Sequence, residues 1–82
     1  MNLQIKKAIA ALEIKGVGVI AFTEKTAHMY FRCNEILRLQ KKVMFKDELN
    51  KIENIQFIID EFSSGLEIFI NYEEKYVDNI TR

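Results

Sequence analysis

Apolar residues at helical spacing near the start of the chain predict a first helix over residues 2–14. Steps of four and three residues place three large aliphatic side chains on one side of it: Ile5, Ile9 and Leu12. Asn2 is a suitable N-cap, because its side chain accepts hydrogen bonds from the first unpaired N–H groups of a helix. Gly16 follows the last turn and ends the helix.

Two strands are predicted next, over residues 17–23 and 27–33, with a turn at residues 24–26. Because successive side chains of a strand point to opposite faces, the second strand divides into two sets. One face carries Ala27, Met29, Phe31 and Cys33. The opposite face carries His28, Tyr30 and Arg32.

A further helix is predicted over residues 34–43, with Asn34 as its N-cap. Its apolar stripe consists of Ile36, Leu39 and Val43. We expect a break near residues 44–46 and a new helix from Asp47. Asp47 and Glu48 suit the first turn of a helix, where the helix dipole favours negative charge.

The pattern of residues 45–62 is compatible with two kinds of secondary structure. Six apolar residues keep helical spacing and favour one long helix: Phe45, Leu49, Ile52, Ile55, Ile59 and Phe62. The alternation of Ile55, Phe57 and Ile59, together with the many β-branched residues, favours a strand over residues 55–62 instead. Both alternatives stay open at this point.

The last elements are a strand over residues 66–72 and a short helix over residues 73–81. Apolar side chains alternate along the strand: Leu66, Ile68, Ile70 and Tyr72. The apolar pattern of residues 5–33 is also similar to that of residues 45–72, which suggests two helix–hairpin halves. A true repeat would make residues 55–62 a strand.

These elements predict a single α+β domain over residues 1–82. The expected fold is an antiparallel sheet of three to four strands with two to three helices. Its element order is α-β-β-α, then an α or β element, then β-α. The 49% apolar content is enough for a core.

Charge divides the chain at Lys46 and Asp47, although the formal net charge is zero. The first 46 residues hold nine Lys or Arg and three acidic residues, a net charge of +6; the rest hold three and nine, a net charge of −6. Such asymmetry indicates a macromolecular partner or the pairing of opposite surfaces between copies.

Catalytic and metal-binding patterns are weak in this sequence. A structural zinc site needs about four Cys or His ligands, whereas the chain has one Cys and one His. Cys33 and His28 lie on opposite faces of one predicted strand, which argues against a nucleophile–base pair. Adjacent carboxylates rarely form the two sides of a catalytic cleft. We therefore expect no enzyme, no metal and no cofactor.

The basic half contains two candidate nucleic-acid surfaces. One consists of Arg38, Lys41 and Lys42, which share a face of the predicted helix, together with Lys46 just beyond the helix. The other is the strand face of His28, Tyr30 and Arg32, because basic side chains around an aromatic ring can hold phosphates and stack on a base. The isoelectric point near 6.6 is low for a nucleic-acid-binding domain.

The acidic half is the leading candidate for binding a protein. Its candidate residues are Asp60, Glu61, Glu67, Phe69, Glu73 and Glu74. One face of a sheet there would expose Ile58 and Phe69 as an apolar patch. A homodimer that pairs basic with acidic regions is another use of the same charge pattern.

The expected localisation is cytoplasmic, because a lone cysteine suits a reducing compartment. No apolar run reaches the roughly 18 residues that a membrane span requires. We therefore expect a small non-enzymatic binding protein, a regulator or inhibitor of the kind that phages and mobile elements encode. A nucleic-acid-binding module is the alternative.

Overall fold

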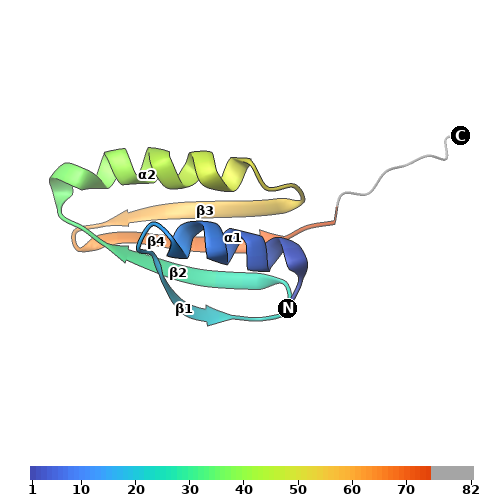
Figure 1. The fold of residues 1–82 in the computed structure, drawn as a ribbon. Coiled ribbons are helices and arrows are strands. Elements are labelled where there is room, and N and C mark those ends of the chain that lie inside the picture. Colours follow the sequence, from blue (N-terminus) through green and yellow to red (C-terminus); the bar gives the residue numbers. More distant parts are fainter. Residues whose placement is uncertain (75–82) are drawn as a thin grey trace, which may run out of the picture.

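The computed structural model describes residues 1–74, which form a four-stranded antiparallel sheet with two helices. The elements are α1 (Leu3–Glu13), β1 (Gly18–Phe22), β2 (Thr26–Arg32), α2 (Glu35–Asn50), β3 (Ile55–Phe62) and β4 (Gly65–Tyr72). The strand order is β1-β2-β4-β3 (Figure 1). The expected α+β class is therefore confirmed.

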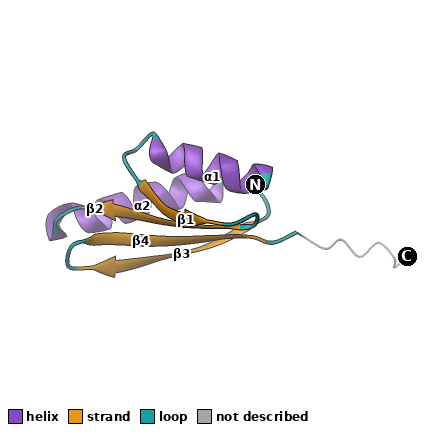
Figure 2. Ribbon diagram, turned by 90° about the horizontal axis from the view of Figure 1, so that it is seen from below, coloured by secondary structure: helices purple, strands orange, loops and turns teal. Residues whose placement is uncertain are grey.

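Both helices lie on the same face of the sheet, as the view from below shows (Figure 2). Helix α1 packs toward β1, β2 and β4, and α2 packs toward β3 and β4. The core between these layers holds the inward side chains of the strands and the sheet-facing side chains of the helices. Its largest fully buried members are Phe45, Ile5, Leu12, Met29, Leu49, Leu66, Ile68 and Ile70.

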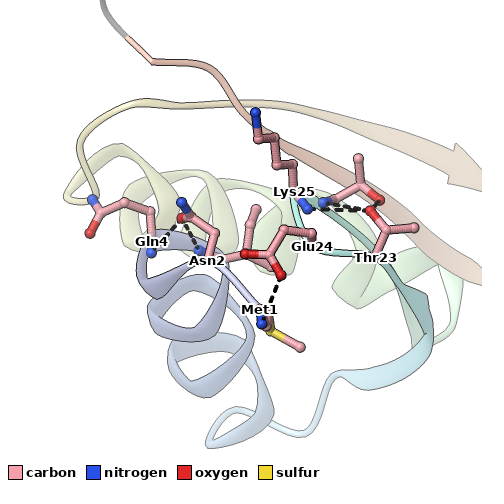
Figure 3. A network of polar contacts seen from close by, with 8 residues as sticks. Met1, Asn2, Gln4, Thr23, Glu24 and Lys25 are labelled. Carbon is pink, nitrogen blue, oxygen red and sulfur yellow. Dashed lines mark hydrogen bonds and ion pairs between the residues drawn. The ribbon is translucent and has the colours of Figure 1, made fainter.

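The start of α1 is tied to the β1–β2 turn. The Asn2 side chain accepts hydrogen bonds from the backbone N–H groups of Gln4 and Ile5, at 2.8 and 3.3 Å, which confirms it as the N-cap. The N-terminal amine of Met1 lies 3.0 Å from the carboxylate of Glu24 (Figure 3). The backbone N–H of Asn2 also donates to the carbonyl of Glu24. These contacts hold the first helix against the first hairpin.

Helix α2 corrects one prediction, because it runs without a break from Glu35 to Asn50. No helix begins at Asp47, which lies in the last turns of α2. The chain has neither Gly nor Pro in this range, so nothing in the backbone interrupts the helix. Burial of Phe45 and Leu49, one turn apart, carries the helix through the expected break.

Residues 55–62 form strand β3, which resolves the ambiguity of the sequence. Asn54 adopts a left-handed backbone conformation with φ of 63°, and so separates the end of α2 from the strand. Ile55, Phe57 and Ile59 then face the core side, as strand alternation predicts.

The helix expected over residues 73–81 lies outside the described residues, apart from Glu73 and Glu74, which belong to no helix. The described elements follow the order α-β-β-α-β-β. An internal repeat of residues 5–33 and 45–72 would produce such an order, and the repeat itself stays a prediction.

Gly65 allows β2 and β4 to approach closely at the end of the sheet. A Cβ atom at this position would overlap the carbonyl oxygen of Phe31 and lie 3.0 Å from the Cα atom of Arg32. Gly18 is a matched control, because a Cβ there would have ordinary contacts, the nearest at 3.8 Å.

We expect Gly65→Ala to lower the free energy of unfolding by at least about 2 kcal/mol, because the backbone of β2 must move. Gly18→Ala should change it by less than about 1 kcal/mol. Urea denaturation followed by circular dichroism measures both values. Similar midpoints for the two variants would contradict the close approach of β2 and β4.

Candidate functional site: the open face of the sheet

The face of the sheet opposite the helices is uncovered in residues 1–74 (Figure 2). Four side chains lie opposite one another across all four strands: Ala21, His28, Phe69 and Ile58. Ile58 is 62% exposed and Phe69 is 39% exposed. We call these four residues the apolar row. Their exposure agrees with the expectation that Ile58 and Phe69 form a surface patch.

His28 is held in place within the apolar row. Its Nε2 atom lies 2.6 Å from a carboxylate oxygen of Glu67, which is a neighbouring residue on β4. Its ring also stacks on Phe69, with the ring centroids 4.4 Å apart and an interplanar angle of 15°. Two contacts of different kinds therefore hold the imidazole of His28 in place, and the stacking orders Phe69 with it.

A second set of residues crosses the sheet beside the apolar row. Tyr30 lies opposite Glu67, and Glu67 lies opposite Asp60. The hydroxyl of Tyr30 donates to the Ser64 side chain, at 2.7 Å. Asp60 and Glu67 are like charges directly opposite each other on neighbouring strands, which is unfavourable. Within residues 1–74, no ion pair involves Asp60.

A shallow groove of about 360 Å³ lies over the apolar row at one end of the face. His28, Ile58 and Phe69 line its apolar part. Thr26, Gln56 and Asn71 line it as well and bring polar groups to its border. The groove has the size of a small binding site, with mostly apolar contacts and a few polar groups that can orient a bound side chain.

The structure brings together three of the six residues predicted to bind a protein. Asp60, Glu67 and Phe69 share the open face. Glu61 lies on the helix-covered side, next to α2. Glu73 and Glu74 follow the far end of β4, about 20 Å from Glu67 at the usual rise of a strand. The predicted acidic set is therefore not one surface, because alternation and strand direction separate its members.

The predicted basic helix face is turned toward the sheet rather than toward solvent. The guanidinium of Arg38 donates to the carbonyl of Phe62 at 2.8 Å, and its side chain is only 16% exposed. Lys42 lies 2.9 Å from the carboxylate of Glu61, and the ammonium of Lys41 lies over the ring of Phe31. Three of the four cations proposed for nucleic acid therefore contact the protein itself. Lys46 is exposed.

The three residues of the second set predicted for nucleic acid lie together on the open face. His28, Tyr30 and Arg32 all lie on that side of β2, as alternation predicts. Their surroundings could not be inferred from β2 alone. The carboxylates of Glu67 and Asp60 lie next to them, so the face does not carry the surplus of positive charge that a polyanion requires.

The sequence alone did not predict that β1 contributes to the open face or that His28 stacks on Phe69. Ala21 completes the apolar row, and the neighbouring Ile20, at a β-bulge, is 55% exposed. Alternation places His28 and Phe69 on the same face only once β2 and β4 are known to be neighbours. No local signal in the sequence predicts that neighbourhood.

Two other properties follow from residues 1–74. No group of three or more His, Cys, Asp or Glu side chains there is arranged to hold a metal ion. None of the helices in this range is long and apolar enough to cross a membrane. Comparison with family models, curated proteins and solved structures gave no match.

Glu61 is the acidic partner of both Arg38 and Lys42. The hydrogen bond and the positive charge of Lys42 hold the pKa of Glu61 below its ordinary value of 4.5, with a smaller contribution from Arg38. A carboxylate whose pKa is lowered by folding stabilises the fold above its unfolded pKa. That contribution is lost as the pH falls through the folded pKa.

We therefore expect the wild type to be more stable than Glu61→Gln at pH 7, and the difference to shrink as the pH falls below about 4.5. Urea denaturation of both proteins across this pH range measures the difference. Glu74→Gln, at an exposed position beyond β4, is the control and should show little change. A difference that persists unchanged at pH 3 would argue against an ionic role for Glu61.

Proposed function

We propose that this chain is a small non-enzymatic binding protein that uses the open face of its sheet to bind another protein. The observation that carries the proposal is the exposed apolar row across all four strands, with the groove beside it. A regulatory or inhibitory role, of the kind expected from the sequence, would act through this contact.

The shape and rigidity of the row support a protein partner. Exposed apolar patches bordered by polar residues are typical of interaction sites. Strands hold their side chains more precisely than loops do, and the stacking of His28 on Phe69 orders the centre of the row. Little side-chain freedom is then lost on binding, which favours affinity. An aromatic or aliphatic side chain of the partner would fill the groove.

The acidic pair beside the row indicates what the partner carries. Asp60 and Glu67 repel each other in the isolated protein, and His28 relieves only Glu67 through its hydrogen bond. A Lys or Arg of the partner placed between the two carboxylates would remove this repulsion. We therefore propose a partner surface with an apolar anchor and a basic residue next to it.

Nucleic acid is the alternative, and one observation favours it. His28 and Tyr30 offer partly exposed rings on a central strand, with Arg32 at its end, and such rings can stack on bases. The adjacent carboxylates and the internal contacts of Arg38 and Lys42 favour a protein partner instead.

The proposal predicts that Ile58→Lys abolishes binding of the partner without affecting the fold. Ile58 is 62% exposed, so a lysine there disrupts the apolar row and not the core. Affinity capture from nuclease-treated host extract, quantified by mass spectrometry, compares the variant with the wild type. Ile14→Lys is the matched control, because Ile14 is 82% exposed at the end of α1.

A protein lost with Ile58→Lys and retained with Ile14→Lys would support the proposal. A captured protein retained equally by both variants would contradict it. Binding that disappears on nuclease treatment would favour the nucleic-acid alternative.

Asp60→Asn gives a second prediction, in which stability and binding change in opposite directions. Removal of one of two facing carboxylates should raise the free energy of unfolding by about 0.2–1 kcal/mol. The same change should slow association with a basic partner and reduce its salt dependence. Urea denaturation and surface plasmon resonance against the captured partner measure the two effects. An Asp60→Asn variant that is less stable would mean that Asp60 has a structural role.

A further inference from the structure

The outer side of α2 carries a second apolar surface, separate from the open face of the sheet. Ile36 is 86% exposed, Leu39 is 66% exposed and Val43 is 53% exposed. These three residues are the stripe predicted for this helix, and the pattern of a surface helix normally places such a stripe against the core. Here the buried residues of α2 are Phe45 and Leu49, and both lie in its second half.

The orientation of α2 explains why the stripe faces outward. Arg38 and Lys42 lie on the sheet side of the helix, where they contact the carbonyl of Phe62 and the carboxylate of Glu61. Each residue of an α-helix is rotated by about 100° from the last. The side opposite Phe45 therefore holds Ile36, Leu39 and Val43 within an arc of about 60°. Steps of three and four residues are the spacing of a seam between two helices.

We propose that a second copy of this chain covers the stripe, with the two α2 helices antiparallel about a two-fold axis. The helix layer and the open face lie on opposite sides of the molecule (Figure 2). This contact therefore leaves the proposed partner site accessible and does not depend on it.

Charge complementarity selects the second copy and its direction. Helical rotation places Glu35 and Lys46 on the same side of the stripe, close to its two ends and about 16 Å apart along the axis. If Leu39 of one copy packs against Val43 of the other in an antiparallel pair, Glu35 lies beside Lys46 of the second copy. The symmetry makes this contact twice. A parallel two-fold pair would place Glu35 and Lys46 of the two copies on opposite sides of the seam, so this contact would not form.

The ends of the stripe fit the same arrangement. In the antiparallel pair, Lys46 of one copy lies over Ile36 of the other. The long aliphatic part of a lysine can cover an apolar side chain while its ammonium reaches a carboxylate. Ile36 is the most exposed large apolar residue of the described chain, and it would be covered in this way.

Three apolar residues and two flanking charged residues from each copy form a small interface, below the standard size for stable complexes. We therefore expect a reversible dimer with a Kd on the order of 100 µM. Such a dimer would carry two open sheet faces, and two linked sites raise the strength of binding to a partner that presents two copies of its own surface.

Sedimentation velocity of the full chain between about 10 µM and 1 mM tests the dimer. The wild type should shift toward twice the 9.7 kDa mass of one chain as the concentration rises. Leu39→Lys should stay monomeric, with an unchanged circular dichroism spectrum because Leu39 is exposed. Ile58→Lys, on the open face, is the control and should dimerise like the wild type.

A wild type that stays monomeric up to 1 mM would overturn the proposal. So would a dimer that Leu39→Lys leaves intact, or one that only Ile58→Lys disrupts, since the sheet face would then be the contact.

A charge reversal tests the antiparallel arrangement separately. Glu35→Lys and Lys46→Glu should each weaken the dimer by about fivefold, because each places like charges together at two symmetric contacts. The double variant restores opposite charges and should return the Kd to near the wild-type value. A double variant that dimerises no better than the single ones would rule out the antiparallel contact of Glu35 with Lys46.

Discussion

The antiparallel pairing of β2 with β4 is the contact on which the rest of the structure depends. Its seven residue pairs, from Thr26 with Asn71 to Arg32 with Gly65, join the two hairpins into one sheet. The inward side chains of these strands, among them Met29 and Ile68, form the centre of the core. Their outward side chains form the centre of the open face, where His28 stacks on Phe69. The same backbone pairing therefore organises both the stability of the fold and its proposed binding surface.

The small number of helices is a second constraint on the structure, because it limits how much of the sheet can be covered. The described chain supplies two, and both pack on one side of the sheet. The opposite side is then left to solvent or to a partner. In this protein it is mixed: the apolar row crosses the sheet next to facing carboxylates. That combination of exposed apolar groups and facing like charges is more typical of an interaction surface than of a plain solvated face.

The contacts of Glu61 with Arg38 and Lys42 give the cations on the sheet side of α2 a partner. Exposed ion pairs contribute little free energy, and α2 is anchored mainly by Phe45 and Leu49. Because α2 is one continuous helix, the burial of Phe45 and Leu49 also turns Arg38 and Lys42 of its first half toward the sheet, where they make polar contacts at the end of the β3–β4 hairpin. In the first half of α2, the cations therefore face the sheet and the aliphatic side chains face solvent, the reverse of the usual arrangement. This inversion removes the predicted basic face and creates the apolar stripe.

The sequence by itself determined most of the local structure. Apolar periodicity placed α1, strand-forming residues placed β1 and β2, and alternation placed β4 and sorted His28 and Tyr30 onto the face opposite Met29. Asn2 and Asn34 were correctly identified as N-caps from their position alone. These features depend on neighbouring residues in the chain, so local patterns carry them.

Only the tertiary structure decided how these elements combine. The choice between helix and strand for residues 55–62 depended on β4 as a partner, because the residues fit both periodicities. The continuity of α2 and its orientation depended on the burial of Phe45 and Leu49 against the sheet. The candidate site likewise combines residues from four strands, and it separates Glu61 from Asp60 although they are adjacent in sequence. Contacts between residues far apart in the chain decide these features, and a local pattern holds no information about which distant segments become neighbours.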